Sequence, residues 1–207
     1  MSDQTPNSTQ CCRGKTVALW AIPLIVIAAG GAWAYASYLQ TYHLATVQEG
    51  VLFRDGNRGM REFETAVRRS NVKTVVSLID DQELADPSKP MFAEELDWCK
   101  QQGVKVVRIP VRLGGWPKTQ DLRKFLEVVQ EKQNQPVLVH CAQGVRRTGM
   151  FVAAFQETVL GWDDAKVKAN LLTFGHGHRT VKDVERFVDV YDAKEKAVTA
   201  PLEQSEE

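Results

Sequence analysis

The sequence predicts an α/β fold, with a central, mostly parallel sheet flanked by helices and preceded by one N-terminal transmembrane helix. One observation predicts the sheet and its helices. Short apolar runs rich in β-branched residues alternate with longer amphipathic stretches, as in parallel strands joined by crossover helices. A second observation, a charge-free run over residues 16–39, predicts the membrane helix. The 207 residues suffice for one ordinary domain in addition to this helix.

Three apolar runs are expected to form buried parallel strands: Lys73–Ile79, Val104–Ile109 and Pro136–His140. Before them, Leu44–Arg54 is expected to form a short hairpin that turns at Glu49-Gly50. Helices are expected between and after the strands, where apolar side chains recur at helical spacing. The expected helices are Gly59–Ser70, Met91–Gln102, Thr119–Gln133, Thr148–Leu160, Asp163–Thr173 and Val181–Ala197.

The N-terminal run has no Asp, Glu, Lys or Arg from Thr16 to Leu39, and large aliphatic residues fill its centre. A helix needs roughly 20 predominantly apolar residues to cross the hydrocarbon core, and aromatic residues favour the two interfaces. Trp and Tyr residues lie towards the ends of this run. The sequence therefore predicts a polar tail over residues 1–15, a single-pass transmembrane helix over 16–39, and a protein held in a membrane.

A cleaved secretory signal is the alternative for this segment. Arg13 and Lys15 precede the apolar run, and Ala34-Tyr35-Ala36 before Ser37 matches an Ala-x-Ala cleavage site. For a retained span, the same two charges favour a cytoplasmic N-terminus and a domain on the far side, because the next basic residue is Arg54. Two charges are a thin basis, so the side of the membrane stays open.

Charge and cysteine content exclude several classes of protein. Lys and Arg together number 26, as do Asp and Glu, so no basic excess exists for a nucleic-acid backbone and no nucleic-acid partner is expected. Four cysteines, with Cys11 and Cys12 adjacent, form neither a disulfide framework nor a spaced zinc site. The globular domain is expected over residues 42–198, followed by an acidic tail over 199–207.

One stretch concentrates the chemistry: Val139-His140-Cys141-Ala142-Gln143-Gly144-Val145-Arg146-Arg147-Thr148-Gly149. It begins where a strand is expected to end and finishes where a helix is expected to start. The residues between Cys141 and Arg147 can wrap once around a tetrahedral anion, with their amides pointing inward at the positive end of the next helix. Gly144 permits the tight turn, and Arg147 offers a planar fork to two phosphate oxygens. The sequence predicts a phosphate-binding loop made of Ala142, Gln143, Gly144, Val145, Arg146 and Arg147.

Cys141 is the expected nucleophile of this loop. A cysteine at a helix N-terminus beside arginine can have its pKa lowered from ~8.5 to roughly 3.5–7.5, so that the thiolate exists at neutral pH. The hydroxyl of Thr148 is expected to donate to the sulfur and to ease its departure in a second step. We expect His140 to orient the loop rather than to act as a base, because a thiolate needs none.

The stretch from His140-Cys141 to Arg147-Thr148-Gly149 resembles the HCx5R[ST]G signature of protein tyrosine and dual-specificity phosphatases. The resemblance extends to Gly50–Arg54, Val72–Leu78 and Thr148–Val190, and is greatest to the compact bacterial dual-specificity-like phosphatases. It implies a protein-tyrosine-phosphatase-like fold over 42–198 and a two-step hydrolysis of a phosphorylated protein or another phosphomonoester. In this implied mechanism Cys141 forms a cysteinyl-phosphate that water then hydrolyses, while Arg147 and the loop amides bind the equatorial oxygens. No metal or cofactor is expected, because loop and guanidinium supply the electrostatic stabilisation.

The family's general acid has no counterpart at its usual place. The family carries an aspartate about 30 residues before the nucleophile, and here the window Ile109–Trp116 contains no carboxylate. Asp121 is the nearest upstream acid and a weak candidate, since the first turn of an expected helix gives it a capping role instead. Losing leaving-group protonation typically costs 10²–10⁴-fold in rate. The acid is therefore unknown from sequence.

Three alternatives stay open beside a protein phosphatase. Arg112 and Arg146 could meet further phosphates, which keeps phosphoinositide or inositol-phosphate substrates possible. The missing acid also fits a catalytically weak phosphate-binding module. A sulfurtransferase of the rhodanese kind also uses a cysteine loop, but Arg147 and Thr148 at these spacings argue against it.

Overall fold

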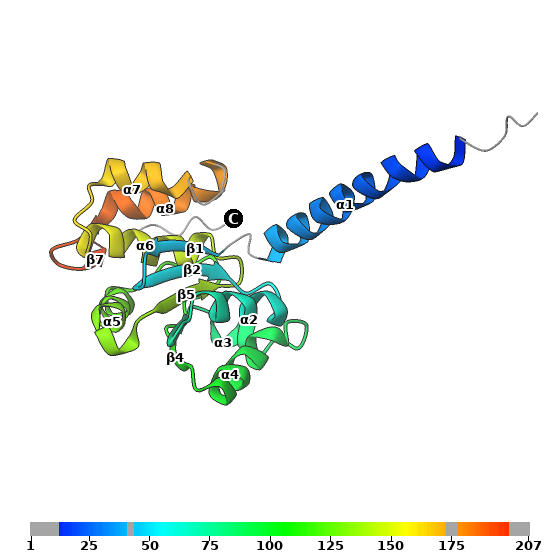
Figure 1. Cartoon of the computed structure of the whole chain (residues 1–207). Helices are drawn as coiled ribbons and strands as arrows, with labels where there is room; N and C mark the ends of the chain where they lie inside the picture. Colours follow the sequence, from blue (N-terminus) through cyan, green and yellow to red (C-terminus); the bar gives the residue numbers. More distant parts are fainter. Residues whose placement is uncertain (1–12, 41–43, 173–177, 199–207) are drawn as a thin grey trace, which may run out of the picture. The chain divides into compact units, whose positions relative to one another are not determined.

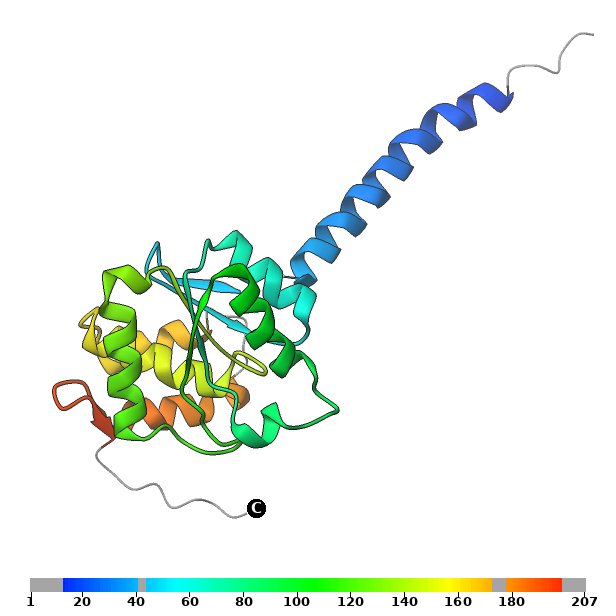
Figure 2. The same cartoon turned by 90° about the horizontal axis from the view of Figure 1, so that it is seen from below.

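The computed structural model describes residues 13–40, 44–172 and 178–198, with side chains for 22–36, 44–172 and 181–198 (Figures 1 and 2). The chain divides into two compact units, residues 1–42 and 43–207. In the first unit the described residues form one helix, α1 (Arg13–Gln40). The predicted tails over 1–15 and 199–207 lie largely or wholly outside the described residues.

The prediction of a transmembrane helix over residues 16–39 is not supported. The segment is helical, as expected, but none of the helices in the described part of the chain is both long enough and apolar enough to cross a membrane. Pro23, Gly30 and Gly31 interrupt the large aliphatic side chains of α1. Membrane attachment, which was predicted from that span, is not supported either. The orientation of the chain stays a prediction.

The second unit is built on a five-stranded sheet in the order β1-β2-β5-β3-β4. β1 pairs antiparallel with β2, and the other neighbouring pairs are parallel, which confirms the expected mostly parallel sheet. β5 lies in the middle between β2 and β3, so its end is surrounded by other strand ends. The strands are β1 (Ala45–Gln48), β2 (Leu52–Gly56), β3 (Thr74–Ser77), β4 (Lys105–Arg108) and β5 (Val137–Cys141).

Both faces of the sheet are covered by helices, because the central strands are apolar on both sides. Along β5, Val137 and Val139 belong to the larger core cluster, whereas Leu138 between them belongs to the smaller one. Figure 1 shows α2 and α4 against one face and α5 and α6 against the other, with α7 and α8 packed on α6. The helices are α2 (Met60–Arg69), α3 (Asp81–Leu84), α4 (Met91–Gln102), α5 (Thr119–Gln130), α6 (Arg146–Thr158), α7 (Asp164–Leu171) and α8 (His178–Val190).

The expected hairpin and the three expected strands are confirmed, with one addition. The second strand of the hairpin, β2, continues to Gly56 and pairs with β5, where Gly56 lies opposite Cys141. The expected helix over 181–197 ends earlier, at Val190, because Tyr191–Asp192 (β6) and Ala197–Val198 (β7) form a small hairpin instead. The predicted helix over 119–133 also ends early, at Gln130, and a short 3₁₀ turn over Lys132–Asn134 follows.

The arrangement of the sheet determines where a ligand can bind. In open α/β sheets, ligands bind outside the carboxyl ends of the parallel strands. β5 runs into Cys141 at this edge, and α6 starts after a short loop, at Arg146. The segments that follow β3 and β4 reach the same edge, since β3 and β4 run parallel to β5.

Candidate active site

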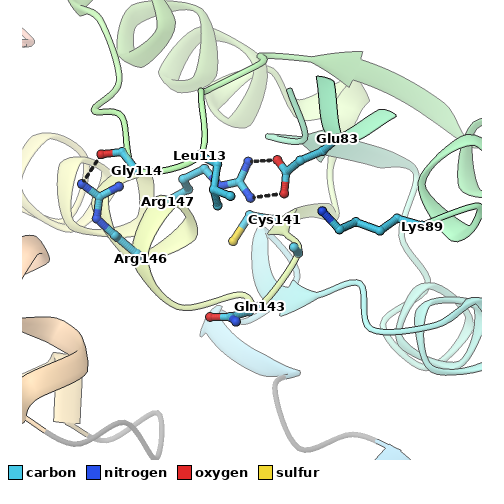
Figure 3. Close-up of a pocket in the computed structure, with 9 residues that line it drawn as sticks. Glu83, Lys89, Leu113, Gly114, Cys141, Gln143, Arg146 and Arg147 are labelled. Carbon is cyan, nitrogen blue, oxygen red and sulfur yellow. Dashed lines mark hydrogen bonds and ion pairs between the residues drawn. The ribbon is translucent and has the colours of Figure 1, made fainter. Parts of the chain in front are cut away.

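The loop between β5 and α6 folds back onto the sulfur of Cys141. The Gly144 N–H donates to Cys141 Sγ at 3.2 Å, and Gly144 has a φ of +68°, a conformation that suits glycine. Cys141 is only 3% exposed and reaches the surface through a pocket of about 270 Å³. Ala142, Gln143, Arg146 and Arg147 line this pocket together with Cys141, so most of the predicted phosphate loop lies around it (Figure 3).

One predicted member of the loop, Val145, and the predicted catalytic residue Thr148 contribute from behind the loop. Val145 is buried at the start of α6 and accepts a hydrogen bond from the Gly149 N–H at 2.8 Å. Thr148 is fully buried, and its hydroxyl faces the sulfur of Cys141. The hydroxyl has no other hydrogen-bond partner within the described residues, so it is available to a thiolate.

The end of β2 fastens the loop in place. A Cβ atom on Gly144 would lie 2.5 Å from the carbonyl oxygen of Asp55, and one on Gly56 would lie 2.5 Å from the carbonyl carbon of Gln143. The buried guanidinium of Arg54 donates to the Gly144 carbonyl at 2.6 Å. Only glycines allow this approach of two backbones. The run Gly50–Arg54 forms part of the family resemblance, but sequence reasoning gave Arg54 and Gly56 no role.

Arg147 is held by a buried carboxylate that sequence reasoning missed. Its Nη2 donates to Glu83 Oε1 at 2.9 Å and its Nη1 to Glu83 Oε2 at 2.5 Å, a bidentate pair between two almost fully buried side chains. Nη1 also donates to the carbonyls of Leu78 and Val111. The Nε–H has no hydrogen-bond partner among the described residues. The guanidinium is thus fixed along one edge, and its other edge keeps donors for an anion in the pocket.

A short helix presents Glu83 to Arg147. Asp80 follows β3 and caps α3: its Oδ1 accepts from the Glu83 N–H at 2.7 Å, and Glu83 Oε2 accepts in return from the Asp80 N–H. The other oxygen, Asp80 Oδ2, accepts from the Leu113 N–H at 2.9 Å. Although burial opposes it, hydrogen bonds from Glu83 and Leu113 and the charge of Arg147 hold the pKa of Asp80 below its ordinary value. Asp80 is therefore ionised and fixes the pocket wall.

Arg146 does not face the pocket as a free cation. Its Nη1 and Nη2 donate to the carbonyls of Gly115 and Gly114 at 2.7 and 2.8 Å, and its Nε donates to Asp183 Oδ2 on α8. These bonds fix the segment in which the family places its general acid. The hypothesis that Arg146 meets a further phosphate is weakened, since its donors are already paired. Arg112, the other candidate, is exposed and does not line the pocket.

A buried polar network lies behind the nucleophile. Glu95 on α4 accepts from Ser77 Oγ at 2.8 Å and from Asn57 Nδ2, and His140 Nε2 lies 3.3 Å from Glu95 Oε1. Burial would lower the pKa of His140, but the carboxylate of Glu95 outweighs it and raises that pKa above its ordinary value. When protonated, His140 places a positive charge one residue before Cys141. This agrees with an orienting His140 rather than a base.

The environment of Cys141 favours the thiolate. Burial alone would raise its pKa, but the charge of Arg147 and hydrogen bonds from Thr148 and the Gln143 amide lower it below the ordinary value. Cys99 behaves in the opposite way: it lies buried in the smaller core cluster, and burial raises its pKa to about 12. Of these two thiols, only Cys141 is poised to act as a nucleophile near neutral pH.

This contrast predicts how the two thiols react with an alkylating reagent. Because the thiolate is the reacting form, iodoacetamide should modify Cys141 with a midpoint clearly below pH 8.5, the ordinary value for cysteine. Thr148→Val should shift that midpoint upward, since it removes a donor to the sulfur. Mass spectrometry of the two peptides measures this, with Cys99 as the internal control that stays unmodified. A Cys141 midpoint at or above pH 8.5 would contradict the assignment of the thiolate.

The weak acid candidate of the sequence, Asp121, lies outside the pocket. Its Oδ2 accepts from the Lys118 N–H at 2.9 Å at the start of α5, so it caps that helix. The pocket lining instead contains two charged residues that sequence reasoning missed, Glu83 and Lys89. No cluster of three metal-ligating side chains occurs among the residues that the structure describes.

Comparison with known proteins identifies the family. Residues 39–188, well over half of the chain, match the model of the family described as "DSP-PTPase phosphatase fused to NAD+ Kinase". The chain belongs to this family. The family resemblance seen in the loop between Cys141 and Thr148 is thereby confirmed, and this DSP-PTPase domain includes every pocket-lining residue.

Two relatives of this DSP-PTPase domain have names that describe their activity. The dual specificity protein phosphatase TpbA of Pseudomonas aeruginosa is 30% identical over 125 residues, which is 60% of this chain and 50% of TpbA. The inositol diphosphatase SIW14 of Saccharomyces cerevisiae is 24% identical over 150 residues, which is 70% of this chain and 50% of SIW14. The chain thus spans about half the length of the curated relatives that it matches.

Solved structures of the same two proteins share the fold. The match to the core catalytic domain of the PP-IP phosphatase SIW14 in complex with citrate has a TM-score of 0.61 at 23% sequence identity. This match covers 74% of this chain and 87% of the SIW14 chain. The match to TpbA in complex with pTyr has a TM-score of 0.59 at 22% sequence identity. It covers 76% of this chain and 89% of the TpbA chain. The expected protein-tyrosine-phosphatase-like α/β fold is confirmed.

Proposed function

We propose that this chain hydrolyses phosphomonoesters with the thiolate of Cys141 as nucleophile, and that a phosphorylated tyrosine is its preferred substrate group. One observation carries the proposal: the sulfur lies at the base of a pocket where Gly144 N–H points at it and Arg147 is locked beside it by Glu83. The relatives support the class, since TpbA is named a dual specificity protein phosphatase and has been solved with pTyr.

The proposed reaction has two steps. A phosphate dianion binds in the loop, where the backbone amides and the free edge of Arg147 bind the equatorial oxygens. Cys141 Sγ attacks the phosphorus, the S–P bond forms, and the bond to the leaving oxygen breaks. Water then attacks the cysteinyl-phosphate, inorganic phosphate leaves, and the thiolate is regenerated with Thr148 as its hydrogen-bond donor. The loop and the guanidinium stabilise the charge in both transition states.

Phosphorylated tyrosine fits this pocket better than an alkyl ester does. A phenol is a better leaving group than an alcohol and depends less on protonation. Leu113 lines the pocket, is 64% exposed and offers an apolar surface to an aromatic ring. The window 109–116 holds no carboxylate to protonate a poor leaving group.

An inositol phosphate is the second candidate substrate. The pocket carries the ammonium group of Lys89 beside the predicted phosphate loop, and SIW14 is named an inositol diphosphatase. A panel of phosphotyrosine, phosphoserine and inositol-phosphate substrates, compared by kcat/KM, separates the two candidates. The proposal expects phosphotyrosine to rank first.

The test of the proposed function uses the full chain with an aryl phosphate. We expect hydrolysis by the unchanged protein, and a loss of at least about 10⁴-fold in kcat for Cys141→Ser. Phosphate binding, measured by calorimetry, should persist in Cys141→Ser because the loop amides and Arg147 remain. Cys99→Ala is the matched control and should hydrolyse normally. No turnover by the unchanged protein between pH 5 and 7, with phosphate still bound, would favour a phosphate-binding module instead.

A further inference from the structure

Among the described residues that line the pocket, no carboxyl group is free to protonate the leaving oxygen. Three carboxylates near the loop are already engaged as hydrogen-bond acceptors: Glu83 by the guanidinium of Arg147, Asp80 by two backbone amides, and Asp121 by the Lys118 N–H. Asp80 is ionised, and Asp121 is outside the pocket. Arg146 and Arg147 line the pocket, but guanidinium groups do not give up a proton in proteins.

Among the described residues that line the pocket, Lys89 is the one remaining side chain with a proton to transfer. It lies in the segment between α3 and α4, and Figure 3 shows its ammonium group directed towards the loop that carries Cys141, on the opposite side from Arg146. The side chain is 39% exposed, so it is neither free on the surface nor sealed in the core.

The segment around Lys89 is built to hold this position. Lys89 Nζ lies 3.1 Å from Asp86 Oδ2, and the Lys89 N–H donates to the Asp86 carbonyl at 3.0 Å. Asp86 in turn accepts from the hydroxyl and the N–H of Ser88, and these bonds together with Lys89 lower its pKa to about 2. Pro87 and Pro90 restrict the backbone on both sides. The ion pair limits the range of positions that the Lys89 side chain can adopt.

Resting on the proposed function, we propose that Lys89 is the general acid of the reaction and protonates the oxygen of the leaving group. As the S–P bond forms and the P–O bond to the leaving group breaks, a proton moves from Lys89 Nζ to that oxygen, leaving a neutral amine. In the second step the amine takes a proton from the attacking water while the P–O bond forms and the S–P bond breaks. Lys89 is then an ammonium group again, and no other reactant is needed.

The chemistry of an ammonium group suits a phenolic leaving group. The ordinary pKa values of a lysine side chain and of a phenol are about 10.4 and about 10, so proton transfer between the two is nearly balanced. General acid catalysis is most effective for the leaving groups that need it, and its removal typically costs 10²–10⁴-fold. A strongly acidic leaving group such as nitrophenolate needs little help. The contribution of Lys89 should therefore grow with the pKa of the leaving phenol.

The experiment compares kcat/KM for a series of aryl phosphates with leaving groups from nitrophenol to unsubstituted phenol, and for a phosphotyrosine peptide. Lys89→Met should reduce kcat/KM by about 10²-fold or more for phenyl phosphate and phosphotyrosine, and only a few-fold for nitrophenyl phosphate. Lys89→Arg keeps the charge without an available proton and should not restore activity. Lys100→Met, which changes an exposed lysine on α4 outside the pocket, is the matched control and should behave like the unchanged protein.

The outcomes separate this inference from the proposed function. A loss that is equal for all leaving groups and is restored by Lys89→Arg would overturn the general acid and make Lys89 a substrate-binding cation. Unchanged kcat/KM for Lys89→Met across the series would overturn it as well. In both cases Cys141-dependent hydrolysis would stand. If Cys141→Ser hydrolysed as well as the unchanged protein, the proposed function itself would fail.

Discussion

Arg147→Met is expected to lower kcat/KM by at least about 10³-fold and to destabilise the protein by roughly 3–5 kcal/mol. The loss of activity follows from the loss of the donors that face the phosphate. The loss of stability follows because the carboxylate of Glu83, which is 6% exposed, is left buried without its bidentate partner. Steady-state kinetics and denaturant unfolding measure the two effects separately.

The double variant Arg147→Met/Glu83→Gln separates these two roles of the guanidinium. Removing the buried charge together with its partner should recover much of the stability, because a neutral amide is far less costly to bury than an unpaired carboxylate. Activity should stay as low as in the single variant. If the double variant recovered activity along with stability, Arg147 would be only a structural partner of Glu83, and its proposed role in binding phosphate would be wrong.

Gly144→Ala is expected to abolish most of the activity and to destabilise the fold. Its φ of +68° strains any L residue, and the new Cβ atom would lie 2.5 Å from the Asp55 carbonyl oxygen and 2.7 Å from the Gly56 nitrogen. Neither backbone atom can move without shifting the end of β2 or the loop around Cys141. We expect a loss of roughly 2–4 kcal/mol in stability and of at least about 10²-fold in kcat/KM.

Gly50→Ala is the matched control for this change. Gly50 has the same φ of +68°, but a Cβ atom there would meet nothing within 4 Å. It should cost only about 1 kcal/mol, the strain of the backbone alone, and leave kcat/KM unchanged. Equal effects of the two substitutions on activity would show that the close approach of β2 to the loop does not position the nucleophile. Thermal unfolding and aryl phosphate hydrolysis on both variants provide the comparison.

The nucleophile and its loop could be predicted because their chemistry is concentrated in consecutive residues. Between Cys141 and Thr148, the spacing alone indicates a loop at a helix N-terminus, and the structure brings Cys141, Gly144, Arg147 and Thr148 together as expected. The sheet was predictable for a similar reason, because its strands are short, apolar and separated by amphipathic stretches.

Glu83 could not be assigned from sequence because it lies 64 residues before its partner. A helix as short as α3 leaves no periodic pattern. One local signal did exist: Asp80-Asp81-Gln82-Glu83, directly after an expected strand, matches a capping box and marks a helix start at the sheet edge. Lys89 had no such signal, since its position depends on the path of the segment between α3 and α4.

The transmembrane prediction over residues 16–39 is not supported, because none of the helices in the described part of the chain is long and apolar enough to span a membrane. The sequence reasoning weighed the charge-free run over residues 16–39 together with its aliphatic centre and the aromatic residues towards its ends. Pro23 and the pair Gly30-Gly31 lie within the segment.

The most direct test of the account is to trap the covalent intermediate on Cys141. The unchanged protein is mixed with a fast aryl phosphate, quenched in acid within the first turnover, and digested for mass spectrometry. The account predicts one added phosphoryl group on the peptide that contains Cys141, and none on that peptide from Cys141→Ser. A rapid release of phenol without any phosphoryl group on Cys141, or with the group on another residue, would contradict it.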